Sequence, residues 1–280
     1  MSKNYEEQYL DLGRKILEEG VSIRNKRTGV DCITIPEHTL YYDVANDPPP
    51  LLTTKQSFPV SAWAEMLGYL RRYEWADQFD KIGSKTWYGN ANETEDWLNN
   101  PHRLGENHLG AVYGAGLNPS ELPDLFNKLM NHHDDRGLVI DFWKPELFDK
   151  IALRSCMYRH TFTIIGDTLY LESNQRSSDY GCGINFNSLQ CYFLLKFFSH
   201  ITGLKAGKVK HNMVNVHIYS SHVDAVIEQL SRAPQDVKAG CEISEWVSSF
   251  DDLLLPVHAR EYFTISDYTH QGKIEFKMVS

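Results

Sequence analysis

The pattern of hydrophobic and polar positions along the chain predicts helices and strands in a mixed order. Apolar residues recur at helical spacing over residues 5–19, and Gly20, a common helix C-cap, follows them. Polar and apolar residues alternate over 31–42, which predicts a strand. By the same criteria we expect further helices at 61–73, 122–130 and 188–201 and one that ends at Arg232, and strands at 137–143, 157–172 (hinged at Gly166-Asp167), 212–219, 262–265 and 273–278. Residues 87–116, rich in glycine and asparagine, are expected to form an irregular excursion. The expectation is an α+β fold in one domain, 1–280, without a linker.

Composition narrows the class of protein. The formal net charge of −9 argues against a general attraction to nucleic acid or anionic membranes, although a local basic pocket can still bind phosphate. No apolar run approaches the roughly 20 residues of a membrane helix, and the first residues lack the apolar stretch of a signal peptide. The five cysteines are widely spaced and include no Cys-x-x-Cys pair, which favours free thiols in a reducing cytoplasm over disulfides or a zinc site.

One short run, residues 174–187, gathers the groups needed to hold a phosphorylated heterocycle. Arg176 and Ser177 offer a guanidinium and a hydroxyl to a phosphate. The carboxamide of Asn187 offers one donor and one acceptor, which matches the O4/N3–H edge of uracil. Taken alone, the run leaves two alternatives open: a surface salt bridge for Arg176 and a helix N-cap for Asn187.

Two residues upstream of this run are candidates for covalent and proton-transfer chemistry. Free cysteines such as Cys156 are usually inert core residues, but the flanking Arg154 and Arg159 would lower the pKa of the thiol and favour the thiolate. Glu65 lies in a predicted helix between apolar neighbours. A helical glutamate is usually exposed, whereas a buried one has a raised pKa and can move protons near neutrality.

A predicted strand near the C-terminal third carries His217 and Tyr219. Residues two apart share a strand face, so both side chains can point at one ligand. His217 and His222 also suggest a metal pair, but nothing in the sequence supplies a convincing third ligand, and we therefore expect no metal.

The order and spacing of these blocks resemble the thymidylate synthase family, which includes pyrimidine nucleotide hydroxymethylases. The matching blocks are Tyr9-Leu10-Asp11-Leu12 with Arg27-Thr28-Gly29, Leu51-Leu52-Thr53-Thr54-Lys55, Leu109-Gly110-Ala111-Val112-Tyr113-Gly114, Gln175 to Asn187, and His217 to Arg232. The resemblance implies a large mixed β-sheet flanked by helices, with one sheet face forming a homodimer interface. It also implies transfer of a one-carbon unit from 5,10-methylenetetrahydrofolate to C5 of a pyrimidine nucleotide.

The resemblance assigns a role to each matching residue. The implied catalytic residues are Cys156, which adds to C6 of the base, with Glu65, Tyr113 and Asp179. The implied nucleotide-binding residues are Arg27, Arg176, Ser177, Asn187, His217 and Tyr219, with Arg136 donated across the dimer. The implied folate-binding residues are Trp87, Asp179, Gly183 and Phe186, and the tail 270–280 is expected to close over the folate.

Several positions depart from the family's synthase pattern. The cysteine is flanked by Ser155 and Met157 instead of proline and histidine, Asn90 replaces a tryptophan, and Gly137 replaces the second of two arginines. In the reaction that the resemblance implies, the base passes through an intermediate with a methylene group attached to C5, and hydride or water reaching this carbon gives the methyl or the hydroxymethyl product. Because replacements such as Met157 and Asn90 would alter the water around this carbon, we favour hydroxymethylation of dUMP. The alternatives are a thymidylate synthase making dTMP and dihydrofolate, a dCMP or CMP hydroxymethylase, and a degenerate nucleotide-binding protein without turnover.

Overall fold

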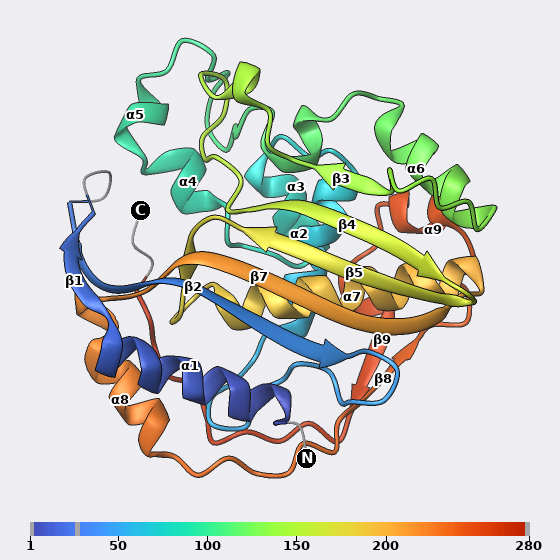
Figure 1. The fold of residues 1–280 in the computed structure, drawn as a ribbon. Coiled ribbons are helices and arrows are strands. Elements are labelled where there is room, and N and C mark those ends of the chain that lie inside the picture. Colours follow the sequence, from blue (N-terminus) through green and yellow to red (C-terminus); the bar gives the residue numbers. More distant parts are fainter. Residues whose placement is uncertain (1–2, 26–28, 278–280) are drawn as a thin grey trace.

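In residues 3–25 and 29–277, which the computed structural model describes, a mixed sheet of seven strands forms the centre of the molecule (Figure 1). The strands run in the order β1 (Val21–Arg24), β2 (Asp31–Asp43), β7 (Lys205–Tyr219), β5 (Thr168–Gln175), β4 (Met157–Ile165) and β3 (Val139–Asp141), and β6 (Ser178–Asp179) pairs with β7. The pairs β5–β7 and β6–β7 are parallel, and the other pairs of this sheet are antiparallel. A second, small sheet pairs β8 (Gly240–Ile243) with β9 (Phe263–Ser266).

The long helix α7 (Ile184–Thr202) is buried on nearly every side. It packs on β5 and β7 and against α2 (Pro59–Leu70), where Trp63 stacks on Phe197 with 4.3 Å between ring centroids. Figure 1 shows α2 and α7 behind the sheet. This enclosure explains why α7 has buried residues around most of its circumference and no single apolar face.

Shorter helices surround this core. They are α1 (Tyr5–Glu19), α3 (Ala76–Ile82), α4 (Tyr88–Asn92), α5 (Glu95–Leu98), α6 (Glu121–Met130), α8 (Val223–Ser231) and α9 (Phe250–Leu254), with 3₁₀ turns η1 (Tyr113–Gly116), η2 (Pro145–Leu147), η3 (Ser220–His222) and η4 (Ala259–Glu261). None of the helices in the described ranges has the length and apolar character needed to cross a membrane.

The opposite face of the large sheet is open. Along β5, Leu169 and Leu171 are buried, whereas Tyr170 and Glu172 alternate with them and are partly exposed. In Figure 1, no helix of the described chain crosses the near side of β4, β5, β7 and β2. The strand registers assign to this face four large hydrophobic residues that are 37% to 65% exposed: Tyr41, Val139, Ile165 and Val214.

A buried carboxylate holds the loop between β2 and α2. Glu6, on α1 and only 2% exposed, accepts hydrogen bonds of 2.7–2.9 Å from the amides and hydroxyls of Thr53 and Thr54. The next residue, Lys55, buries its ammonium group and donates to the Gly181 carbonyl at 2.7 Å. The loop is thereby tied to the turn that precedes α7.

Most predicted elements are confirmed, with boundaries shifted by a few residues. The hinge at Gly166 and Asp167 is the β4–β5 turn, and 87–116 contains only short helices. The strand predicted at 273–278 is wrong, because 273–277 form neither strand nor helix. No element was expected where the structure has β1, α3, β6, β8 and α9, all of them too short to show a clear period.

Candidate functional site

Cys156 lies directly before β4, at the end of the sheet. Its backbone amide donates to the Tyr113 hydroxyl at 3.0 Å, and its carbonyl accepts from the Arg176 amide at 2.9 Å. The residue is partly exposed, which a nucleophile requires. The structure thus places Cys156, Tyr113 and Arg176 together, although they come from three separate parts of the chain.

Arg176 holds the segment that carries the cysteine. Its Nε donates to the Ser155 carbonyl and its Nη2 to the Arg154 carbonyl, both at 2.9 Å. The guanidinium also lies 5.2 Å from the centre of the Trp143 ring. This anchoring gives the group a fixed orientation, which favours binding of a phosphate in one geometry.

The two arginines that flank Cys156 in sequence have other partners. Arg159 forms an ion pair with Asp141 through hydrogen bonds of 3.0 and 2.5 Å, so its charge is compensated. The Arg154 guanidinium lies over the Phe148 ring at 4.4 Å from its centroid. Activation of the thiol by these two neighbours stays a prediction.

Glu65 is buried on α2, with 8% of its surface exposed. Burial raises the pKa of Glu65, and hydrogen bonds from Thr86, Tyr69 and Gln190 oppose that rise. Thr86 donates to Oε2 at 2.5 Å, and the Tyr69 hydroxyl donates to Oε1. The Tyr69 ring in turn stacks on Tyr113 at 4.1 Å. A continuous path of contacts therefore joins the carboxylate of Glu65 to Cys156.

Trp87 packs edge-on against Tyr113, with 5.9 Å between the ring centroids. Its Nε1 is buried and has no hydrogen-bond partner among the described residues. A buried donor without a partner is costly, so this atom is suited to an acceptor that a bound molecule would bring.

Asn187 belongs to a directed chain of side-chain hydrogen bonds. His211 Nε2 meets Gln175 Oε1 at 2.8 Å, and Gln175 Nε2 donates to Asn187 Oδ1 at 3.0 Å. Asn187 Nδ2 donates to Gln190 Oε1 at 2.8 Å, and Gln190 Nε2 donates to Glu65 Oε1 at 3.3 Å. Burial lowers the pKa of His211 to about 3, so the ring stays neutral. Every donor in the chain points toward Glu65, which leaves Asn187 one amide orientation.

Sequence reasoning missed the polar residues that support the site, although signals for them existed. Gln190 follows Asn187 by three residues and Tyr69 follows Glu65 by four, spacings that place side chains on one helix face. His211 shares strand parity with Val209 and Met213, so it is a polar residue on the inward face of β7.

His217 lies opposite Asp179 in the pairing of β7 with β6, and its ring is 4.8 Å from that of Tyr219. His217 Nδ1 donates to the Asn215 carbonyl at 2.7 Å, so in the neutral ring Nε2 carries the lone pair. Nε2 is buried without a partner among the described residues. The pair therefore offers an acceptor suited to a sugar hydroxyl.

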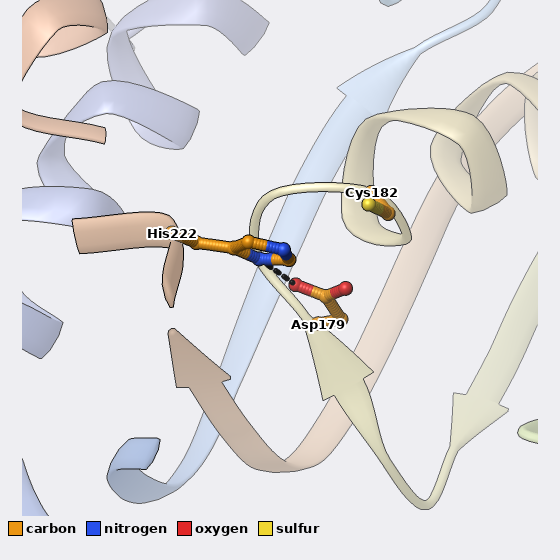
Figure 2. Close-up of side chains that lie close together, drawn as sticks. All are labelled: Asp179, Cys182 and His222. Carbon is orange, nitrogen blue, oxygen red and sulfur yellow. Dashed lines mark ion pairs between the residues drawn. The ribbon is translucent and has the colours of Figure 1, made fainter. Parts of the chain in front are cut away.

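Asp179 is a second carboxylate of the site. Burial alone would raise the pKa of Asp179, but the ion pair with His222, the nearby His217 and the hydrogen bond from the Gly181 amide lower it below its ordinary value. Figure 2 shows the His222 ring and Asp179 facing each other, with 3.7 Å between Nδ1 and Oδ1, and Cys182 beside them. Candidate ligand atoms of Asp179, Cys182 and His222 lie within 4.8 Å of one another. The buried Lys55 ammonium beside them opposes a divalent cation at this place.

The remaining predicted residues divide into those near the site and those outside it. Gly183 precedes α7, where an added Cβ would lie 3.1 Å from the Asp179 carbonyl, and Phe186 is partly buried against the core. Ser177 is half-buried next to Arg176. Arg136 is exposed in the loop before β3, and no described contact joins it to the other site residues. Arg27 lies outside the described residues.

Two surface hollows of about 580 and 530 Å³ lie away from these residues. Both include Lys196 and Ala206, and neither is lined by a predicted site residue. These hollows therefore do not coincide with the cluster around Cys156.

Comparisons with known proteins agree with this geometry. The family model described as thymidylate synthase matches residues 7–280. A thymidylate synthase of Pseudoalteromonas translucida is 45% identical over 263 residues, which cover 87% of this chain and 93% of the relative. One from Aliivibrio fischeri is 43% identical over 275 residues, 95% of this chain and 97% of the relative. One from Idiomarina loihiensis is 44% identical over 263 residues, with coverage of 87% and 93%.

These relatives correct one expectation. Each is named a synthase, so the comparisons give no support to the hydroxymethylase subtype predicted from the departures. The extent of the match leaves no doubt about the wider group, because identity above 40% extends over nearly the whole chain. The chain belongs to the thymidylate synthase family, folate-dependent transferases that act on C5 of a pyrimidine with methylenetetrahydrofolate as the co-substrate.

Proposed function

We propose that this protein converts dUMP and 5,10-methylenetetrahydrofolate into dTMP and dihydrofolate. The observation that carries the proposal is the connected cluster in which Glu65 contacts Cys156 through Tyr69 and Tyr113, and contacts Asn187 through Gln190. One carboxylate is thereby linked both to the candidate nucleophile and to the candidate base reader. The names of the relatives, all thymidylate synthases, agree with this assignment.

The residues suggest how the reaction proceeds. The Cys156 thiolate adds to C6 of uracil, and C5 becomes nucleophilic as electron density moves into the ring. Glu65, whose pKa burial raises, is suited to receive and return protons as charge develops on the base. Tyr113 holds the cysteine backbone at 3.0 Å and so fixes the direction of attack. When bound, the folate would supply the one-carbon unit and the hydride that reduces it to a methyl group. The proton on C5 is lost after the one-carbon unit is attached, and the Cys156 sulfur leaves C6 as the product forms.

The residues present fit a folate. We assign Trp87, Asp179, Gly183 and Phe186 to holding it. The unpartnered Nε1 of Trp87 and the ionised carboxylate of Asp179 supply a donor and an acceptor at a largely apolar wall. Glycine at 183 keeps this turn free of side-chain atoms, since an added Cβ would lie 3.1 Å from the Asp179 backbone carbonyl and 3.5 Å from Asn187 Oδ1.

The hydrogen-bond chain supports uracil over cytosine. Asn187 Oδ1 accepts from Gln175 and its Nδ2 donates to Gln190, so one lone pair and one N–H are left for the base. These groups complement the N3–H donor and the O4 acceptor of uracil. Cytosine presents the reverse order, and a flipped amide would direct its N–H groups at the donor of Gln175.

The phosphate is assigned to Arg176 and Ser177, with Arg27 and Arg136 completing the set. Arg136 is exposed and lies apart from the other site residues in one chain, as expected for a residue that serves a second copy. The open sheet face, with its exposed Tyr41, Val139, Ile165 and Val214, supports a homodimer formed through that face.

The argument for hydroxymethylation weakens in the structure. Met157 is 1% exposed, and its sulfur lies 3.4 Å from the Cys191 sulfur inside the core. A side chain packed there fills the core and does not order water beside the reacting carbon. The departure at this position is therefore explained by packing.

The test is incubation of the purified protein with dUMP and methylenetetrahydrofolate. We expect dTMP by mass and an absorbance rise from dihydrofolate. A 5-hydroxymethyl product with no dihydrofolate would overturn the proposed reaction. Covalent labelling by 5-fluoro-dUMP with the folate excludes a binding protein without turnover, and failure of a folded protein to label would support one.

A further inference from the structure

The last described residues of the chain are docked beside Asp179. Cys182 Sγ lies 3.7 Å from the Phe276 carbonyl, and His222 Nε2 lies 2.7 Å from the Lys277 carbonyl. The Phe276 ring meets the His222 ring edge-on at 5.3 Å and lies 4.4 Å from the Lys55 ammonium. A Cβ on Gly181 would come within 2.5 Å of the Phe276 ring, so the tail requires glycine at that position.

His222 is placed between this tail and the carboxylate. A carbonyl can only accept, so Nε2 must donate its proton to Lys277. In a neutral ring Nδ1 would then present a lone pair to the Asp179 carboxylate, 3.7 Å away (Figure 2), and two acceptors would face each other. Nδ1 is buried without a hydrogen-bond partner among the described residues, so a proton there would let the ring face the carboxylate as an ion pair. The geometry of the docked tail therefore favours a proton on His222.

The surrounding charges determine how strongly that proton is held. Asp179 on β6 and the Lys277 carbonyl favour the cation, and Lys55 in the loop before α2 opposes it. Tyr219 at the end of β7 contributes a ring edge at 5.6 Å. Cys182 in the turn before α7 stays a neutral thiol, because burial raises its pKa to about 12. His217 faces Asp179 from β7, across the pairing of β6 with β7.

Burial lowers the pKa of His222, but Asp179 and the Lys277 carbonyl more than offset this, so the value is raised above the ordinary 6.5. The stabilisation that follows from a raised histidine pKa is complete below the ordinary value and is lost as pH rises through the raised one. Docking of the tail should therefore weaken on the alkaline side of neutrality.

We propose that His222 is a positioning residue that latches the C-terminal tail to Asp179, and that loss of its proton releases the tail. This latch rests on the proposed function only in that Asp179 is assigned to the folate. Closing the tail beside Asp179 would then favour folate binding, whereas dUMP binding would be independent of it.

Hydrogen exchange of the full-length protein, followed by mass spectrometry of peptides covering 268–277, tests the latch without substrate. After correction for the intrinsic pH dependence of exchange, we expect tail protection to fall several-fold between about pH 6 and about pH 9. In His222→Gln, protection should be low and independent of pH, because glutamine can donate to Lys277 but carries no charge. His200→Gln, which removes a ring hydrogen-bonded to the Val247 carbonyl at 3.0 Å, is the matched control and should behave as wild type.

Asp179→Asn supplies a second variant should His222→Gln fold poorly. It removes the charge that holds the proton, so the transition should move to lower pH. In steady state, His222→Gln should raise KM for the folate about tenfold while Kd for dUMP is unchanged. Equal pH dependence of tail protection in wild type and His222→Gln, or none in wild type, would overturn the latch. Absence of turnover with an intact exchange transition would instead remove the proposed function and leave the latch.

Discussion

At the scale of single residues, the site depends on side chains that hydrogen bonds hold in one conformation. Glu65 has three hydrogen-bond donors around its carboxylate, and Asn187 has partners on both sides of its amide. Each has the residue type that the sequence suggested, but the partners give it a defined protonation state or orientation. Substitutions that keep shape and change chemistry are therefore the informative ones.

Glu65→Gln should lower kcat by about 10²- to 10⁴-fold, the usual contribution of one proton-transfer group. Because burial raises the pKa of Glu65, wild-type activity should fall in acid with a midpoint above the ordinary 4.5 of a glutamate. That acid limb should be missing from the residual activity of the variant. The pH profile of kcat measures both, with Glu18→Gln, at an exposed position of α1, as the control. An unchanged profile would remove Glu65 from proton transfer.

Gln190→Leu should weaken discrimination between dUMP and dCMP by about tenfold, because Asn187 then keeps only the hydrogen bond from Gln175 to fix its amide orientation, and the penalty against a flipped amide is smaller. The measurement is kcat/KM for the two nucleotides. Gln229→Leu replaces another buried glutamine, one that donates to Thr54 at 3.1 Å outside the site, and should leave the ratio unchanged. Equal ratios in wild type and Gln190→Leu would mean that the chain of amides does not set base choice.

At the scale of elements, the site is assembled from segments that meet at one end of the sheet. β6 places Asp179 beside His217 of β7, α2 brings Glu65 inward, and α7 brings Asn187 and Gln190. The loop before β3 carries Arg136 away from this meeting point. That arrangement predicts a site shared between two copies.

Mixing Arg136→Ala with Cys156→Ala tests the shared site. Each variant alone should be nearly inactive, but a mixed dimer contains one site with both residues intact. Random subunit exchange should then restore about a quarter of wild-type activity, since half of the dimers are mixed and each has one good site.

Glu65→Gln mixed with Cys156→Ala provides the control for this exchange. Both residues belong to the site of one chain, so no intact site forms and activity should stay low. No recovery in the first mixture, with exchange verified by mass spectrometry, would place Arg136 outside the catalytic site.

At the scale of the whole molecule, buried histidines make the fold sensitive to acid. His160 and His211 lie on the inward face of the sheet, and burial lowers the pKa of each to about 3. The unfolded chain takes up these protons near pH 6.5, whereas the folded one does not. Stability from this source is complete above about pH 6.5 and is lost as pH falls from there toward about 3.

His160→Asn should reduce that loss. Each buried histidine contributes about 1.4 kcal/mol of lost stability between about pH 7.5 and about pH 5.5, and the variant lacks one of them. The free energy of unfolding in urea at the two pH values, at one protein concentration, measures the difference. His133 is exposed, so His133→Asn should lose as much stability between the two pH values as the wild type does. If His160→Asn lost as much stability between the two pH values as the wild type, proton uptake by His160 would not be coupled to folding.

The sequence by itself determined the periodic elements and the chemical groups of the site. Hydrophobic spacing located α1, α7 and the β4–β5 hairpin, because burial of one face imposes a period on the chain. The run 174–187 made Arg176 and Asn187 candidates, because phosphate and base recognition need particular functional groups in close sequence, and the family resemblance added Asp179. Local signals of this kind survive without knowledge of the fold.

Only the tertiary structure decided which groups meet. Arg159, three residues after Cys156 in sequence, pairs with Asp141, whereas Arg176, twenty residues after Cys156, holds the cysteine segment. The order of amides from His211 to Glu65 joins residues of β7, β5, α7 and α2, and the contact of His222 with Lys277 spans 55 positions. Such contacts depend on how strands pair and helices pack. The pairing and packing are set by the free energy of the whole chain, so they leave no pattern in any short stretch of sequence.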